Sequence, residues 1–235
     1  MAGTKHQLQR LASPSRSISA LVHLIGIASF SASFRWLAIF PNPEDKKFGG
    51  SFQFLTIIGL ALALTSMVLG FLADLTLNQT LFNTKNIISV CATPLEVLIS
   101  ILYWGLCFID KRLLFPEELQ LPFLPDFGFH AMPAIMLALD LLLLSPPWTI
   151  KFRGAVALST FLAFGYWAWI EFCFSHNQSY PYPIFTFLST PQRVGLFLFA
   201  GVTCALSTTG LKWLYGKING IEELKREALN PVKTD

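Results

Sequence analysis

Two side chains in this sequence are suited to covalent chemistry, the hydroxyl of Thr56 and the imidazole of His130. A threonine hydroxyl is a poor nucleophile unless a base takes its proton as it attacks, and a neutral imidazole, with an unperturbed pKa near ~6.5, is suited to that task. The two residues stand near the starts of the second and fourth of six apolar stretches. Because even-numbered membrane spans begin from the same side of a bilayer, the sequence predicts that Thr56 and His130 lie at one membrane face.

Both residues also have a purely structural interpretation. A threonine in a membrane helix usually bonds back to a carbonyl of the preceding turn, and a histidine at the end of a span can anchor the interface through hydrogen bonds. The pair Gly49-Gly50, shortly before Thr56, permits unusual backbone conformations. Its backbone amides are therefore candidates to meet a developing oxyanion.

A third group usually orients a catalytic base, and here it stays open between Asp126, Asp140 and a backbone carbonyl. Asp140 is ten residues beyond His130, which is about 15 Å along an ideal helix, so direct contact would require a broken helix. Asp126 is nearer to His130 in the sequence.

The elements that must position these groups are transmembrane helices. The 235-residue chain is 53% hydrophobic and 13% charged, with a mean hydropathy of +0.54, which is too apolar for an ordinary soluble domain. Helices satisfy their own backbone hydrogen bonds in lipid, and about 20 apolar residues cross the ~30 Å hydrocarbon core. We therefore predict an all-α polytopic membrane protein with about six transmembrane helices, near residues 18–34, 52–73, 87–109, 129–144, 154–174 and 193–215.

The chain is predicted to form one transmembrane domain over residues 18–215, with short cytosolic tails at 1–17 and 216–235. Both termini are assigned to the cytosol because most of the 17 lysines and arginines fall in the tails and in the second and fourth loops. An alternative interpretation of the first stretch is a secretory signal cleaved near residues 31–33. The endoplasmic reticulum membrane is favoured over the plasma membrane. Of two glycosylation sequons, only the one at Asn177 falls in a predicted lumenal loop.

Ionisable groups inside the predicted spans are few, and they are functional candidates because they are costly in lipid. His23, Glu96 and Asp140 are the deepest of them. The fourth predicted span is short and contains Pro133, so it is expected to be central and to line a cavity with His130 at its mouth. A transporter of a small solute or lipid is therefore an alternative to an enzyme, and a non-catalytic membrane scaffold is another.

Several classes of chemistry are disfavoured by the motifs of this sequence. Its four histidines, at positions 6, 23, 130 and 176, have none of the spacing of a zinc or di-iron motif. There is no Gly-x-Ser-x-Gly elbow, phosphate-binding glycine loop or dinucleotide fingerprint at a usable position. We therefore expect no cofactor and no metal. The mild net charge of +3 gives no indication of a nucleic-acid partner.

Several short segments, in a shared order and spacing over most of the chain, carry a resemblance to a known family. Through these segments, the chain resembles the androgen-induced and androgen-dependent TFPI-regulating membrane proteins, which are threonine hydrolases of fatty acid esters of hydroxy fatty acids. The resembling segments are Phe48-Gly49-Gly50 with Phe54-Leu55-Thr56, Gly70-Phe71-Leu72-Ala73-Asp74, Tyr103-Trp104-Gly105-Leu106, His130-Ala131-Met132, Gly165-Tyr166-Trp167 and Tyr180-Pro181-Tyr182-Pro183.

The resemblance implies that Thr56 is the catalytic threonine and His130 the catalytic histidine. The implied activity is hydrolysis, without a cofactor, of the ester between a fatty acid and a hydroxylated fatty acid, so the implied partners are this lipid substrate, water and membrane lipids. Relatives commonly carry Asn before the histidine and a second His three residues after it, whereas this chain has Phe129 and Pro133. These departures are expected to affect the support of the histidine and the substrate preference rather than the reaction class.

Overall fold

The protein is described by a computed structural model over residues 16–114 and 121–220. These two ranges contain helices and no β-strand. The long helices are α1 (Arg16–Ile39), α2 (Leu55–Thr76), α3 (Gln79–Asp110), α6 (Phe152–Asn177) and α8 (Thr190–Ile218). The shorter elements are the α-helices α4 (Phe123–His130), α5 (Met132–Leu144) and α7 (Ile184–Phe187), and the 3-10 helices η1 (Pro43–Lys46), η2 (Gly50–Gln53) and η3 (Lys111–Leu113).

The five long helices are each long and apolar enough to cross a membrane. Helices α4 and α5 together form a sixth candidate span, which bends by 43° at a break between them. The prediction of an all-α polytopic membrane protein with about six spans is therefore confirmed. Residues 1–15 and 221–235, which make up most of the two predicted cytosolic tails, lie outside the described residues.

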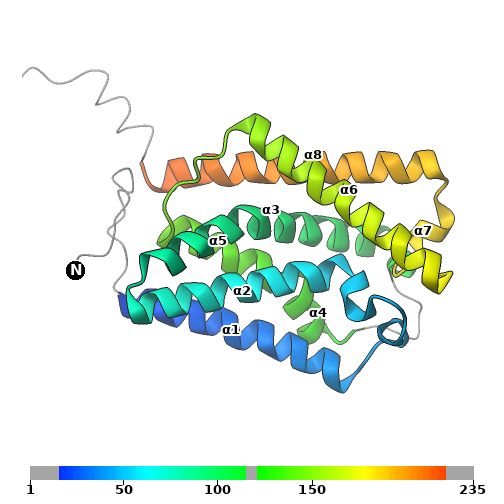
Figure 1. Ribbon diagram of the computed structural model, residues 1–235, viewed down its shortest axis with the longest axis horizontal. Coiled ribbons are helices and arrows are strands. Elements are labelled where there is room, and N and C mark those ends of the chain that lie inside the picture. Colours follow the sequence, from blue (N-terminus) through cyan, green and yellow to red (C-terminus); the bar gives the residue numbers. More distant parts are fainter. Residues whose placement is uncertain (1–15, 115–120, 221–235) are drawn as a thin grey trace, which may run out of the picture.

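The long helices run side by side, with α3 between the α1–α2 pair and the α6–α8 pair (Figure 1). Helix α5 packs against α3 and α1, and α4 packs against α1. The largest cluster of buried apolar side chains joins α1, α2, α3 and α5 through Phe30, Leu60, Met67, Ala92 and Leu137. Because α1 contributes to this core, the structure favours a permanent span over a cleaved signal for the first apolar stretch.

Each of the six spans begins at another residue than the sequence predicted, by two or three residues in four of them and by more in the third and fourth. The second begins at Leu55 rather than at residue 52, because η2 occupies the preceding turn. The third begins at Gln79 rather than at residue 87, and it starts there because the Asn78 side chain accepts hydrogen bonds from the backbone N–H groups of Thr80 and Leu81, at 2.8 and 3.2 Å. The added turns carry polar side chains that the apolar pattern did not include.

The fourth span also differs from its prediction, because it begins at Phe123 instead of residue 129. Its two halves each carry a proline in or beside the first turn, where a helix does not need the missing N–H. Pro133 of α5 cannot donate to a carbonyl of α4, so the helix breaks at Ala131. His130 therefore lies at a break inside the span, and the prediction that it lies near the start of the span is wrong.

A cluster of buried charged side chains ties four helices together at the end of the bundle where α2 meets α3. His23 of α1 lies between two carboxylates, with Nδ1 at 2.7 Å from Asp74 and Nε2 at 3.0 Å from Asp140. Lys85 of α3 donates from Nζ to Asp140 at 2.7 Å and to the Ser145 hydroxyl at 2.7 Å. The cluster explains how α3 can bury a lysine in its first turns, since each charge has a partner of opposite sign.

Replacing Lys85 by methionine is expected to destabilise the protein by about 3 to 5 kcal/mol, because Asp140 would stay buried without its cation. The measurement is the midpoint of thermal unfolding in detergent. Lys151→Met is the matched control, since Lys151 is exposed just before α6. An unchanged midpoint for Lys85→Met would show that the ion pair does not hold these helices together.

Candidate functional site

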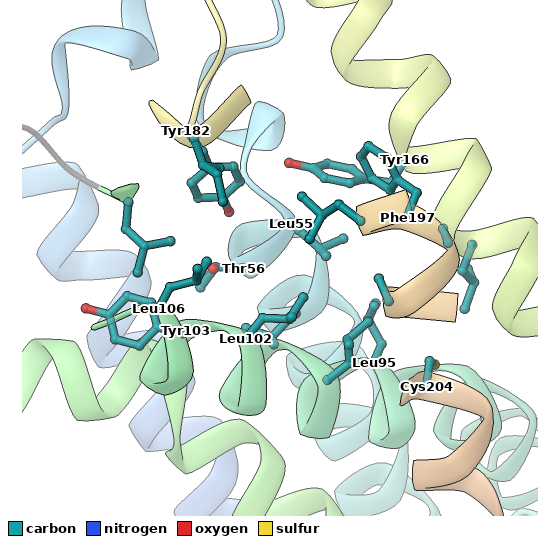
Figure 2. A pocket seen from close by; sticks show the side chains of 18 of the residues that line it. Leu55, Thr56, Leu95, Leu102, Tyr103, Leu106, Tyr166, Tyr182, Phe197 and Cys204 are labelled. Carbon is teal, nitrogen blue, oxygen red and sulfur yellow. The ribbon is translucent and has the colours of Figure 1, made fainter. Parts of the chain in front are cut away.

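Thr56 is the second residue of α2, and its side chain is buried. The other threonines of this helix behave as structural residues, because Thr65 and Thr76 donate to the carbonyls of Ala61 and Leu72 one turn back, at 2.8 and 2.7 Å. The corresponding carbonyl for Thr56 belongs to Phe52 and lies before the helix. Thr56 instead lies beside Tyr182, whose hydroxyl points toward it (Figure 2).

The turn that leads into Thr56 is attached to α6 by three side chains. The Tyr166 hydroxyl donates to the Gln53 carbonyl at 2.8 Å, and the indole N–H of Trp169 donates to the Phe52 carbonyl at 2.9 Å. The third side chain is Asn177, whose Nδ2 donates to Gln53 Oε1 at 2.9 Å. Because backbone and side-chain groups are both held, the start of α2 has a defined position.

Asn177 is also bonded to Phe48 in both directions. Its Nδ2 donates to the Phe48 carbonyl at 2.9 Å and its Oδ1 accepts from the Phe48 N–H at 2.9 Å. A glycan is attached through this same nitrogen, so we expect Asn177 to carry none. Treating the protein, purified from a eukaryotic host, with an N-glycosidase should leave its mass unchanged, and a loss of glycan mass that disappears in Asn177→Gln would contradict the expectation.

Gly49 and Gly50 have left-handed backbones, with φ of +88° and +53°, which glycine adopts without strain. The Gly50 N–H donates to the Lys47 carbonyl at 3.0 Å. The prediction that the Gly50 amide is available to an oxyanion is therefore wrong, because this turn uses it internally.

His130 is the last residue of α4, and its side chain is 5% exposed. Its Nδ1 lies 2.9 Å from Asp126 Oδ1 and 3.1 Å from the Asp126 carbonyl oxygen, one helical turn back. Helix α4 therefore begins early enough to bring Asp126 onto the same face as the imidazole. Of the three candidates to orient His130, the structure selects Asp126, through both its carboxylate and its carbonyl.

Helix α3 holds this pair from the other side. The ring of Tyr103 is stacked on the imidazole of His130, with centroids 3.4 Å apart and planes 3° from parallel. The Tyr103 hydroxyl donates to the Asp126 carboxylate, and the Ser100 hydroxyl donates to the His130 carbonyl. Sequence analysis did not identify either α3 residue as part of the site. Tyr103 fell in a segment of family resemblance, but a contact between α3 and α4 has no local signal.

Thr56 and His130 line one cavity of about 120 Å³, which we call the His130 cavity. The two residues most suited to covalent chemistry therefore meet in one space, although they come from different spans. Tyr182, from the connection between α6 and α7, lies with them in this lining. The rest of the lining comes from α1, from the segment after it, and from α2 and α4 with the residues just before them: Trp36, Leu37, Phe40, Pro41, Asn42, Phe54, Ile57, Leu121 and Phe129.

A second cavity, of about 110 Å³, starts from the same threonine and lies among α2, α3, α6, α7 and α8 (Figure 2). We call it the α8 cavity. Thr56 and Tyr182 belong to both linings. Figure 2 shows the Tyr182 hydroxyl pointing toward Thr56, whereas Cys204 lies at the far side of the α8 cavity. The start of α2 therefore separates two spaces and contributes to both.

The Tyr182 hydroxyl lies over the amino end of α2. Burial raises the pKa of Tyr182, and the polar groups of Thr56, Leu55 and Tyr166 beside its hydroxyl oppose that rise. The first N–H groups of a helix have no partner within it, so this point presents several donors beside the threonine. Tyr182 was missed as a site residue, because its Tyr-Pro-Tyr-Pro segment is distant from Thr56 in sequence.

Neither Glu96 nor Asp140 is among the described residues that line the two cavities. Asp140 is bound in the ion cluster with His23 and Lys85, so it cannot orient His130. Glu96 is buried against Gly59 of α2. The contact is so close that a Cβ atom on Gly59 would lie only 2.5 Å from Oε1 of Glu96. The two acids that suggested a transport path are thus separated from the cavities around Thr56.

A metal ion would need several ligands close together. Over residues 16–114 and 121–220, no group of three or more His, Cys, Asp or Glu side chains is arranged to hold one. The polar groups around Thr56 are instead an imidazole, a carboxylate and phenols, which suit proton transfer and hydrogen bonding.

Comparisons with known proteins agree with the family resemblance seen in the sequence. The chain is 32% identical over 194 residues to a protein of Schizosaccharomyces pombe described as a UPF0641 membrane protein, and the match covers 81% of this chain and 86% of that protein. No solved structure matches this chain. A family model described as FAR-17a/AIG1-like protein matches residues 18–216, from α1 to the last turns of α8. The chain therefore belongs to the FAR-17a/AIG1-like family of polytopic membrane proteins.

Proposed function

We propose that this protein is an integral membrane ester hydrolase that cleaves fatty acid esters of hydroxy fatty acids, with Thr56 as nucleophile and His130 as general base. The observation that carries the proposal is the shared lining of one cavity by Thr56 and His130, with Asp126 bonded to the imidazole. A hydroxyl, a base and a group that orients the base are the parts that covalent hydrolases use.

The first half of the reaction forms an acyl-threonine. Asp126 accepts the Nδ1 proton of His130, so the lone pair that takes up a proton is on Nε2. As the Thr56 hydroxyl attacks the ester carbonyl carbon, its proton passes to Nε2. The bond from the acyl carbon to the alcohol oxygen then breaks, and that oxygen leaves with the proton from Nε2.

The second half releases the fatty acid. A water molecule gives a proton to Nε2 and attacks the acyl carbon, and the Thr56 oxygen leaves with that proton. Negative charge develops on the carbonyl oxygen in both halves. The backbone N–H groups of Leu55 and Thr56 at the start of α2, together with the Tyr182 hydroxyl, are the donors suited to stabilise it, and the positive end of the helix dipole adds to their effect.

The chemistry around the threonine supports a lipid substrate. Apart from Thr56, Tyr182, His130 and a few other polar groups, the linings of both cavities are aliphatic and aromatic, as expected for a site that accepts hydrocarbon chains. The resemblance to threonine hydrolases supplies the ester class. The proposed reaction requires water and no cofactor or metal, because its proton transfers use side chains alone.

The proposed location is the membrane of the endoplasmic reticulum, with both termini in the cytosol and Thr56 toward the lumenal face. What supports it is the excess of lysine and arginine in the tails and the even-numbered loops. The lipid substrate would then enter from the bilayer, and water from the lumenal interface.

Replacing Asp126 by asparagine is expected to lower kcat/KM by roughly 10- to 150-fold, the equivalent of about 1.5 to 3 kcal/mol for a hydrogen bond to a charged group. The loss should be smaller than the ~10⁴-fold known for triads, because the Asp126 carbonyl still faces Nδ1 at 3.1 Å. Ester turnover by purified protein is the measurement. Asp110→Asn, which alters an acid paired with Arg112 on the surface, should retain full activity, and full activity in Asp126→Asn would remove Asp126 from the mechanism.

The function itself is tested with purified protein in liposomes, a palmitate ester of hydroxystearic acid, and oxygen-18 water. We expect palmitate and hydroxystearate as products, with the isotope in the palmitate carboxylate, because water attacks an acyl-threonine. Isotope in the alcohol of hydroxystearate, or no turnover of any lipid ester by folded protein, would overturn the proposal.

A further inference from the structure

Thr56 is the boundary between two cavities with different linings. The α8 cavity continues from Thr56 along α3 and α8, past Leu102 and Leu95 to Cys204. The His130 cavity lies on the other side, against α1 and α4. An ester held with its carbonyl carbon at the Thr56 hydroxyl would have one chain on each side of this boundary.

The position of His130 decides which half of the ester takes which side. The leaving alcohol oxygen must receive its proton from this imidazole, so it must lie within hydrogen-bond reach of it. His130 lines only one of the two cavities. The alcohol half is therefore directed into the His130 cavity, and the acyl half, which stays bonded to Thr56 until water attacks, has the α8 cavity left to it.

The linings agree with this division. The α8 cavity away from Thr56 is almost entirely apolar, with aliphatic and aromatic side chains, and small side chains such as Ala163 and Ala200 leave its far part open. The His130 cavity is more polar and includes Asn42 and Trp36 of the segment around the end of α1. An acyl chain is hydrocarbon throughout, whereas a hydroxy fatty acid has a carboxylate at one end, which favours the more polar side.

We propose that the α8 cavity binds the acyl chain of the ester and that the His130 cavity binds the hydroxy fatty acid, so that each cavity sets the length preference for one half of the substrate. This inference rests on the proposed hydrolase function. It assigns specificity to residues that are not part of the reaction itself, in particular Ala163 of α6 and Leu37 of α1.

The experiment measures kcat/KM for two series of esters with four variants. One series varies the acyl chain from butyrate to palmitate on hydroxystearic acid, and the other varies the alcohol from hydroxybutyric to hydroxystearic acid under a palmitoyl chain. Ala163→Phe narrows the α8 cavity, and Ala168→Phe on the exposed face of the same helix is its control. Leu37→Trp narrows the His130 cavity, and Leu24→Trp on the exposed face of α1 is its control.

We expect Ala163→Phe to lower the ratio of palmitate to butyrate turnover by roughly tenfold or more, and to leave the alcohol preference as in wild type. Leu37→Trp should do the opposite, lowering turnover of the long alcohols and sparing the acyl preference. Retained butyrate hydrolysis shows that Ala163→Phe is folded. If Ala163→Phe does not hydrolyse butyrate esters, the ratio of palmitate to butyrate turnover is measured instead for Cys204→Phe, at the far side of the same cavity.

A reversed pattern, in which Ala163→Phe changes only the alcohol preference, would overturn the assignment of the two halves. So would unchanged preferences in active Ala163→Phe and Leu37→Trp proteins. Failure of the hydrolase function gives a different result, because folded wild-type protein would then turn over neither series, or Thr56→Ala would hydrolyse both series as well as the wild type does.

Discussion

Thr56→Ala is expected to lower kcat/KM for fatty acid esters of hydroxy fatty acids by roughly 10⁴- to 10⁶-fold, the range in which hydrolases lose activity without their nucleophile. The change removes one buried hydroxyl at the junction of the two cavities. It leaves the helix start in place, because Tyr166, Trp169 and Asn177 hold the preceding turn through other residues. The measurement is ester turnover by purified protein.

Two further variants separate chemistry from folding at this position. Thr56→Ser keeps a hydroxyl and is expected to retain part of the activity. Thr65→Ala makes the same substitution about two and a half turns later in α2, where the hydroxyl donates to the Ala61 carbonyl at 2.8 Å, and it should be fully active. Substantial turnover by Thr56→Ala would exclude Thr56 as the nucleophile.

His130→Ala is expected to cost about as much as Thr56→Ala, because the nucleophile and its base act as one unit. For the same reason, the double variant should be no worse than either single variant, although independent sites would give additive losses in free energy. Single-turnover kinetics of the three proteins make this comparison.

The control for the histidine is His176→Ala. His176 is exposed at the end of α6, where it stacks on Phe48 with centroids 4.2 Å apart, and its loss should leave turnover unchanged. An additive loss in the double variant would indicate that Thr56 and His130 act in separate steps, contrary to the proposed mechanism.

The fold was predictable because its main signal is local. Runs of apolar residues are long enough to identify each span from sequence, and a span in lipid has to be helical. Span ends were less predictable, as Lys85 shows. A lysine ends an apolar run when the sequence is read alone, but in the structure its charge is matched by Asp140 of α5, so α3 continues through it.

The site was predictable only in part, for the same physical reason. Thr56 and His130 could be selected by residue type and by the alternation of spans, and their meeting in one cavity agrees with that selection. Their catalytic roles stay predictions. The partners of His130 depend on tertiary structure. Asp126 reaches the imidazole because α4 is a separate helix before the break in the fourth span, and Tyr103 of α3 stacks on the imidazole across a contact between helices. No periodicity of the sequence encodes such a contact.

Covalent labelling tests the central claim most directly, because it reports nucleophile and base together. Purified protein is treated with a lipid-like fluorophosphonate, digested, and analysed by mass spectrometry for the modified residue, in wild type and in His130→Ala. We predict one modified residue, Thr56, and a loss of its modification when His130 is replaced. Modification of another residue, or equal labelling of Thr56 with and without His130, would contradict the account.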